Sequence, residues 1–358
     1  MKKLIFSLTV KLFIFSSSFL VLIIIIEILL RTGKQNIEKA TNIVDDGPVY
    51  NLDNRLIYAF KPDSQGTLRG SDFTDFKKIN SFGLRDDEFT NKTDKYRIIA
   101  VGDSFTEGIG VERSSSYPEI LQSLLGQKKV DTEVINAGVS GYSPDQEYRF
   151  IIEKLSDFKP NLIIWNFTYP YDLYDSSLWY PSLYKIEKNM IKAGNGWFNW
   201  LYFQNFLSLY SPSFVKKSYL YTYAYNKLPS VALLNGRPKL SEDQLIDWSI
   251  EKFKLQITDL KSRNDIIVAF LPTKDSLKIK GGFDILKYEM IVEYKTRIKK
   301  ILEGVNCKFI DVGEDLEKYL NYEQIEDLYY KSDIHPNGKG NEIIAEVVAE
   351  KVFEFYFK

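Results

Sequence analysis

Short runs of apolar residues alternate with stretches of helical spacing from residue 97 onward, and this alternation limits the fold more than any other feature of the 358-residue chain. The runs predict five strands: Ile98–Val101, Val134–Asn136, Leu162–Trp165, Ile266–Leu271 and Phe309–Val312. Helices are expected near 117–125, 145–155, 241–261, 288–302 and 337–357. Strands that are apolar at every position are typical of a parallel sheet covered on both faces. We therefore expect an α/β fold of three layers, α/β/α, around a mainly parallel central sheet whose ligands bind beyond the carboxyl ends of the strands.

The expected α/β domain covers residues 96–358 and carries an insertion at about 173–240, where the alternation of strands and helices breaks. The insertion is rich in Trp and Tyr, so it forms either an aromatic mini-core without a role in binding, or a lid or membrane-facing patch beside the site. Residues 32–95 are polar and rich in turn signals, and they predict a stalk followed by a short N-terminal extension.

The first 31 residues predict a single membrane-spanning helix. An apolar stretch runs from Leu12 to Leu30, follows three lysines and closes at Arg31, and its nineteen residues are long enough to cross the hydrocarbon core of a bilayer. Glu27 stands near the far end, where a carboxylate can reach the interface. No cleavage site with small residues follows, so we expect an uncleaved anchor with the remaining chain on the periplasmic or extracellular side.

The composition limits the other partners and cofactors. The formal net charge is −1 and no block of basic residues stands out, so no nucleic-acid partner is expected. The chain holds one cysteine, Cys307, and one histidine, His335, and it therefore cannot form an internal disulfide or a metal site built from several His and Cys ligands. We expect no metal and no cofactor, and the sequence does not indicate an oligomeric state.

Ser104 follows the first predicted strand directly, between Gly102 and Gly108. A serine at a strand-to-helix turn exposes its hydroxyl at the carboxyl edge of the sheet, where a neighbouring base could make it a nucleophile. The alternative is that Ser104 only caps the following helix, as serine often does at such turns.

The candidate base is His335, which lies on the loop before the last predicted helix. Asp333, two positions earlier, could orient the imidazole and balance its charge, which Ser332 could not. The topology of the predicted sheet brings this loop to the edge that carries Ser104.

Three short motifs in this order resemble those of the SGNH (GDSL-type) hydrolase superfamily of esterases, lipases and carbohydrate O-acyl enzymes. They are Gly102-Asp103-Ser104-Phe105, Asn136-Ala137-Gly138-Val139-Ser140-Gly141 and Asp333-Ile334-His335-Pro336-Asn337. The stretch Asn80 to Arg85 is similar to a bacterial subset with an N-terminal membrane anchor. The resemblance implies an SGNH/flavodoxin-like fold, a Ser104-His335-Asp333 triad, and an oxyanion hole that includes the backbone N–H groups of Ser104 and Gly141.

The third motif of the family departs from its pattern here. Tyr171 stands where the family has the asparagine that completes the oxyanion hole, and Asp172 stands where the family has the following aspartate. Either Tyr171 or Asn166 could supply the missing donor, and loss of one such donor typically lowers turnover by ~10²–10³-fold.

These observations predict a serine-dependent acyl-ester hydrolase, such as an esterase, a carbohydrate O-deacetylase or an O-acyltransferase, with an ester or acylated glycan as substrate. The alternative is a catalytically degenerate protein of the same fold that binds surface glycan or serves as an assembly component, and Tyr171 favours this alternative. A lipase that acts at the bilayer is a third possibility, because an aromatic insertion accompanies the anchor.

Overall fold

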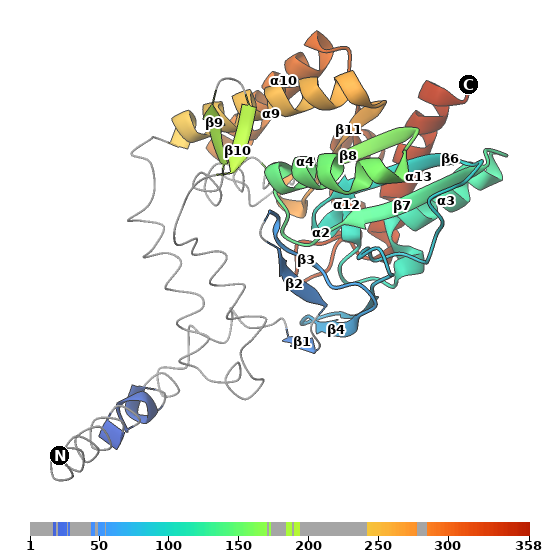
Figure 1. Ribbon diagram of the computed structural model, residues 1–358. Helices are drawn as coiled ribbons and strands as arrows, with labels where there is room; N and C mark the ends of the chain where they lie inside the picture. The colour runs from blue at the N-terminus through green and yellow to red at the C-terminus, as the bar shows by residue number, and fades with distance from the viewer. Residues whose placement is uncertain are drawn as a thin grey trace. The chain divides into compact units, whose positions relative to one another are not determined.

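The computed structural model of the chain describes residues 17–18, 21–26, 28, 44–46, 49–53, 55–169, 172, 184–187, 190–193, 242–277 and 285–358 (Figure 1). The chain divides into two units, one of residues 1–42 with 200–236 and one of residues 43–199 with 237–358. The fold and the site described below lie in the second unit.

A five-stranded parallel sheet forms the centre of this unit, as the alternating pattern predicts. Its order is β12-β11-β8-β6-β7, and every neighbouring pair is parallel. The strands are β6 (Tyr96–Gly102), β7 (Thr132–Gly138), β8 (Leu162–Tyr169), β11 (Ile266–Pro272) and β12 (Lys308–Asp311). Numbered along the chain, the order reads 2-1-3-4-5, the flavodoxin-like arrangement, in which the direction of winding reverses between β6 and β8. A ligand site is expected at the carboxyl ends of these two strands.

Helices cover both faces of the sheet because successive strand residues point to opposite sides. Ile99 and Val101 of β6 join a core with α4 (Pro144–Glu153) and α9 (Glu242–Arg263). Ile98 and Ala100 join a second core on the opposite face. The helices of the two faces are α4, α9 and α10 (Ile285–Gly304) on the first, and α3 (Tyr117–Gln127), α11 (Val312–Tyr319) and α13 (Gly338–Tyr356) on the second. The three-layer α/β/α expectation is confirmed.

Five short helices among the described residues lie in the connections between the main elements. They are α2 (Ser104–Glu107), directly after β6, α12 (Tyr322–Glu326), and the 3-10 helices η2 (Arg113–Ser115), η3 (Leu155–Phe158) and η5 (Lys274–Ser276) before and after the main elements. Helix α2 is a single turn, so it positions side chains at the edge of the sheet but adds little to either core.

Five short antiparallel strands precede the sheet, in the region predicted to hold a stalk and a short extension. They are β1 (Val44–Asp46), β2 (Tyr50–Asp53), β3 (Ile57–Phe60), β4 (Gln65–Arg69) and β5 (Thr74–Lys78). We call residues 49–88 the N-terminal extension. On β5 the usual burial is inverted, because Asp75 and Lys77 are buried while Phe76 is 46% exposed.

The predicted membrane anchor and the predicted insertion fall mostly outside the described residues. Within Leu12–Leu30, residues 17–18, 21–26 and 28 are helical. In the part of the chain that the structure describes, no helix is both long and apolar enough to cross a membrane. Of the insertion, the structure describes one hairpin, β9 (Tyr184–Glu187) paired with β10 (Met190–Ala193). The anchor and the domain boundaries therefore stay predictions.

Candidate active site

The turn after β6 presents Ser104 at the switch point of the sheet. Asp103 caps helix α2, and its carboxylate accepts the N–H of Phe105 at 2.9 Å. Ser104 is the first residue inside the helix, so its hydroxyl is not the cap. The alternative that Ser104 serves only as a helix cap is therefore excluded by the position of Asp103.

Ser104, His335 and Asp333 form one hydrogen-bonded chain. The Oγ of Ser104 lies 2.7 Å from Nε2 of His335. On the other side of the ring, Nδ1 of His335 contacts Oδ1 of Asp333. The same Oδ1 accepts the backbone N–H of His335 at 2.9 Å. The structure thus brings together the three residues that the sequence predicts as nucleophile, base and acid, in the order that such a triad requires.

The His335 loop is held at both ends by hydrogen bonds to backbone groups. The carbonyl of His335 accepts the N–H of Tyr330 at 3.1 Å. Asn337 caps α13 by accepting the N–H of Gly340, and its amide group donates to the carbonyl of Asp327 at 2.7 Å. The ring of Phe105 packs against the imidazole with centroids 5.1 Å apart. The imidazole is therefore fixed by its loop and by the residue that follows the nucleophile.

The electrostatics of the pair favour a charged Asp333. Partial burial opposes ionisation, but the hydrogen bonds and the charge of His335 outweigh it and hold the pKa of Asp333 below its usual value. A carboxylate at this place stabilises the imidazolium that forms when His335 accepts a proton.

A second acid, Asp103, directly precedes Ser104 and is buried. Burial raises the pKa of Asp103, against the hydrogen bonds from Thr168 and Phe105. The hydroxyl of Thr168, on β8, donates to Asp103 at 2.8 Å. The N–H of Thr168 in turn donates to Asp172 at 2.6 Å, and Asp172 is buried. These contacts join the ends of β6 and β8 beneath the triad.

The loop after β7 lies directly against helix α2. Gly138 packs so closely that an added Cβ would lie 2.1 Å from the backbone nitrogen of Glu107. The N–H of Ser140 donates to the Glu107 carboxylate at 2.7 Å. Gly141 follows with a positive φ of 74°, a conformation that glycine adopts without strain. Gly141, the predicted oxyanion donor, therefore belongs to a loop that contacts the helix of the nucleophile.

Asn166 and Tyr171 are the two candidate side-chain donors of the oxyanion hole, and the structure describes only Asn166. The Asn166 amide group donates to the carbonyl of Val101 at 2.9 Å, inside the sheet. This bond disfavours Asn166 as an oxyanion donor, because its N–H group is directed at β6 and not at the triad. Tyr171 lies outside the described residues, so its role stays a prediction.

Several residues that support the site were not predicted. Glu107 is completely buried and forms an ion pair with Lys77 of the N-terminal extension. Tyr58, also of the extension, donates its hydroxyl to the carbonyl of Ser140 at 2.6 Å. The position of Glu107, three residues after the nucleophile in a buried turn, is a signal that could have been used. Nothing in the sequence connects Lys77 with Glu107, 30 positions away, or Tyr58 with Ser140, 82 positions away.

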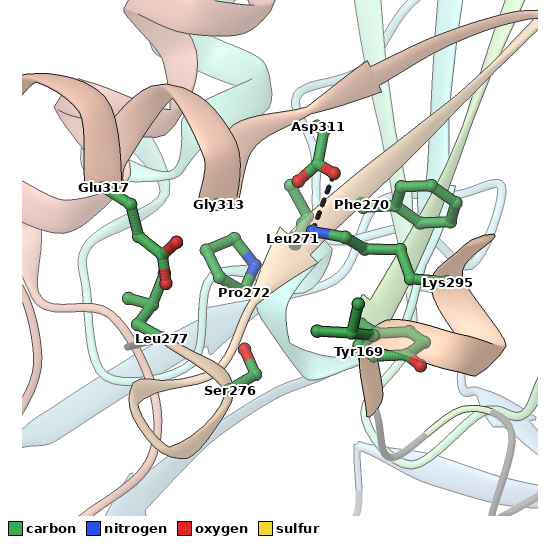
Figure 2. A pocket seen from close by; sticks show the side chains of 11 residues that line it. Tyr169, Phe270, Leu271, Pro272, Ser276, Leu277, Lys295, Asp311, Gly313 and Glu317 are labelled. Carbon is green, nitrogen blue, oxygen red and sulfur yellow. Dashed lines mark ion pairs between the residues drawn. The ribbon is translucent and has the colours of Figure 1, made fainter. Parts of the chain in front are cut away.

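A small cavity of about 40 Å³ lies at the ends of β8, β11 and β12, beside the site but not at the triad. Figure 2 shows Lys295 directed at the carboxylate of Asp311, with 2.7 Å between nitrogen and oxygen. Two lysines, Lys295 and Lys299, hold the pKa of Asp311 below its usual value against the effect of burial. The cavity has room for water molecules only, and it does not contact Ser104 or His335.

The fold and the site together define an α/β protein with a Ser-His-Asp triad at its switch point. Among the described residues, no group of three His, Cys, Asp or Glu side chains is arranged to hold a metal ion.

Comparison with known proteins finds similarity in structure alone. No protein-family model matches the sequence, and no curated protein matches it. The chain is similar to the acetyl xylan esterase AlAXEase, with a TM-score of 0.44 and 17% identity over 72% of this chain and 99% of that one. It is similar to Axe2, an acetylxylan esterase from Geobacillus stearothermophilus, with a TM-score of 0.42 and 15% identity over 74% and 96%. For LAE5, an α/β hydrolase enzyme from the metagenome of Lake Arreo, Spain, the TM-score is 0.43 and the identity 15% over 73% and 97%. At these values the activities of those proteins are not carried over to this chain.

Proposed function

We propose that the protein is a serine-dependent acyl-ester hydrolase in which Ser104 is the nucleophile. The observation that carries this proposal is the hydrogen-bonded chain from Ser104 Oγ to His335 Nε2, at 2.7 Å, and from His335 Nδ1 to Asp333. A serine hydroxyl is a weak nucleophile until a neighbouring base removes its proton, and His335 is placed for that transfer.

The reaction follows from the positions of these groups. His335 accepts the Ser104 proton as Oγ attacks the ester carbonyl, and the negative charge on the carbonyl oxygen is stabilised by the backbone N–H groups of Ser104 and Gly141. The protonated imidazole then donates its proton to the leaving alcohol, and an acyl-enzyme remains. Water, activated by His335, releases the acid; a sugar hydroxyl in place of water would make the same site a transferase.

We infer that the substrate is an acylated glycan outside the cytoplasm. This inference is supported by the apolar segment Leu12–Leu30, which predicts an anchor with residues 32–358 on the outer side. A reporter fused after Lys358 that is active only in the cytoplasm would reverse this orientation and remove surface glycans as substrates.

The test compares the full-length wild-type chain with Ser104→Ala. Wild type should hydrolyse a p-nitrophenyl acyl ester, release acetate from an acetylated glycan, and be labelled by a fluorophosphonate on Ser104, as peptide mapping would show. Ser104→Ala should lose the label and nearly all hydrolysis. Equal hydrolysis by both proteins would overturn the assignment of the nucleophile. A wild type that is folded but neither labelled nor active would favour the alternative of a glycan-binding or assembly component.

A further inference from the structure

We propose that Tyr58, on strand β3 of the N-terminal extension, is a positioning residue that orients the oxyanion donor Gly141. This inference rests on the proposed function, since it concerns the oxyanion hole of that reaction. The extension, residues 49–88, precedes the α/β domain that the sequence predicts at residues 96–358, and no step of the proposed reaction uses it directly.

Tyr58 contacts the peptide group that joins Ser140 to Gly141. The hydroxyl of Tyr58 donates to the carbonyl oxygen of Ser140 at 2.6 Å. That carbonyl and the N–H of Gly141 belong to one planar trans peptide, in which the two bonds point in opposite directions. A hydrogen bond that fixes the direction of the Ser140 carbonyl therefore also fixes the direction of the Gly141 N–H.

The hydroxyl of Tyr58 lies where a side chain at residue 141 would begin. An added Cβ at this residue would lie 2.8 Å from the hydroxyl oxygen of Tyr58. The φ of +74° is in the left-handed region. Both the backbone conformation and the close approach of the tyrosine hydroxyl thus require glycine here. The two residues fit each other as a pair.

The peptide group that precedes Ser140, which joins it to Val139, is held as well. The N–H of Ser140 donates to Glu107 at 2.7 Å, and Glu107 is paired with Lys77 of β5, with 0% and 4% of the two side chains exposed. The N-terminal extension therefore holds the Ser140 carbonyl through Tyr58, and it holds the Ser140 N–H indirectly through Lys77 and Glu107. A residue fixed at both its peptide groups cannot rotate without breaking one of these bonds.

Tyr58 itself is fixed within the extension and against the loop. Its backbone carbonyl accepts the hydroxyl of Tyr142 at 2.7 Å. Its ring lies edge-on to the rings of Tyr50 and Tyr142, with centroids 5.6 and 5.4 Å away. Removal of the hydroxyl leaves the ring packing in place, so Tyr58→Phe tests the hydrogen bond alone.

The kinetic expectation follows from the role of an oxyanion donor. Removing such a donor costs about 10²–10³-fold in kcat, and misorienting it should cost less. We expect Tyr58→Phe to lower kcat for ester hydrolysis by about tenfold with KM changed by less than about twofold, because the donor acts on the transition state and not on the bound ester. Tyr148→Phe is the matched control, since it removes one tyrosine hydroxyl of helix α4 that donates to Asp259 of α9 and not to the loop of Gly141.

A spectroscopic measurement tests the positioning without any reaction. Ser140–Gly141 is the only Ser-Gly pair in the sequence. Full-length protein labelled with 13C-carbonyl serine and 15N glycine therefore gives a single HNCO cross-peak, which reports the Ser140 carbonyl and the Gly141 N–H together. In Tyr58→Phe the carbonyl resonance should move upfield and the Gly141 amide resonance should shift, while in Tyr148→Phe the peak should stay in place.

Each outcome bears on one proposal. An unmoved cross-peak in Tyr58→Phe overturns the positioning role, whatever the activity. A shifted peak with an unchanged kcat overturns its importance for the reaction. The peak could also shift in Tyr58→Phe while wild type shows no Ser104-dependent hydrolysis. In that case Tyr58 still orients Gly141, and it is the proposed function that is overturned.

Discussion

One oxygen of Asp333 accepts two hydrogen bonds from the same residue. Its Oδ1 contacts Nδ1 of the His335 ring and, at 2.9 Å, the backbone N–H of His335. The two contacts fix both the direction of the ring and the tautomer that leaves Nε2 free to accept the Ser104 proton. Asp333 stands two positions before His335, and this spacing allows both contacts because the backbone turns between the two residues.

Asp333→Asn should lower kcat by roughly 10³–10⁴-fold, because an amide can stabilise the wrong tautomer of the imidazole and cannot balance its positive charge. The measurement is hydrolysis of a p-nitrophenyl ester, with thermal unfolding as a check on the fold. Asp157→Asn changes an exposed acid in the same way and should leave kcat unchanged. A loss of less than tenfold in Asp333→Asn would mean that this carboxylate is not the acid of the triad.

The hydrogen-bonded grouping of Ser104, His335 and Asp333 could be predicted because each residue stands in a short motif with its own local geometry. Ser104 follows a buried strand, and His335 with Asp333 precedes a helix, so one topology brings the three together. Tyr58 could not be predicted in this way. Its partner Ser140 is 82 positions away, and a tyrosine in a short strand is ordinarily a packing residue.

At the scale of elements, helix α2 and the loop after β7 are joined through backbone atoms at Gly138. A Cβ there would meet the Glu107 nitrogen at 2.1 Å and the Thr106 carbonyl carbon at 2.5 Å. Backbone atoms cannot rotate aside as a flexible side chain can. Any other residue at this position has to move the nucleophile helix or the loop that carries Gly141.

Gly138→Ala should therefore reduce both stability and activity, with a loss of about 1–3 kcal/mol or more in the free energy of unfolding. Urea unfolding and ester hydrolysis are the two measurements. Gly126→Ala is the matched control, because nothing lies within 4 Å of an added Cβ at that helical position. It should be neutral or stabilising by about 0.5–1 kcal/mol. Equal behaviour of the two variants would contradict the close contact.

The strands of the sheet could be predicted from the sequence, whereas residues 32–95 were predicted only as a stalk followed by a short N-terminal extension. Each sheet strand contains a short run of apolar residues and is followed by a turn or helix, and such a pattern leaves few alternatives. Strand β5 has the opposite pattern, since Phe76 is exposed while Asp75 and Lys77 point inward. Periodicity alone would place Phe76 inside. The charges are buried because Asp75 pairs with Arg85, and Lys77 with Glu107, which a pattern of hydrophobicity cannot show.

For the molecule as a whole, two buried carboxyl groups make stability depend on pH. Burial raises the pKa of Asp86 to about 7 and that of Asp75 to about 6, against the lowering effects of Arg113 and Arg85 respectively. In the unfolded chain both groups titrate near 3.8. Between these values the folded state binds more protons than the unfolded state, so the free energy of unfolding falls as the pH rises from about 4 to about 7.

Wild type should accordingly be less stable at pH 8 than at pH 5 in urea unfolding, and Asp86→Asn should show a smaller difference between the two. The amide oxygen of the variant can still accept the Asn136 N–H that Asp86 accepts at 2.8 Å, so the fold is preserved. Asp131→Asn is the control, because its side chain is 80% exposed and its change should leave the slope with pH intact. If Asp86→Asn did not reduce the change in the free energy of unfolding between pH 5 and pH 8, the raised pKa of Asp86 would be contradicted.

The ion pair between Lys77 and Glu107 has a consequence for how such a chain can be recombined. A crossover near residue 95 would separate the lysine from its carboxylate and leave one charge buried without its partner, at a cost of about 3–5 kcal/mol. The Arg85 side chain, which donates to the carbonyls of Glu107, Gly108 and Val111, would be lost in the same exchange. Residues 49–88 and the α/β domain should therefore be inherited as one unit, and tolerated crossovers should fall before Val49.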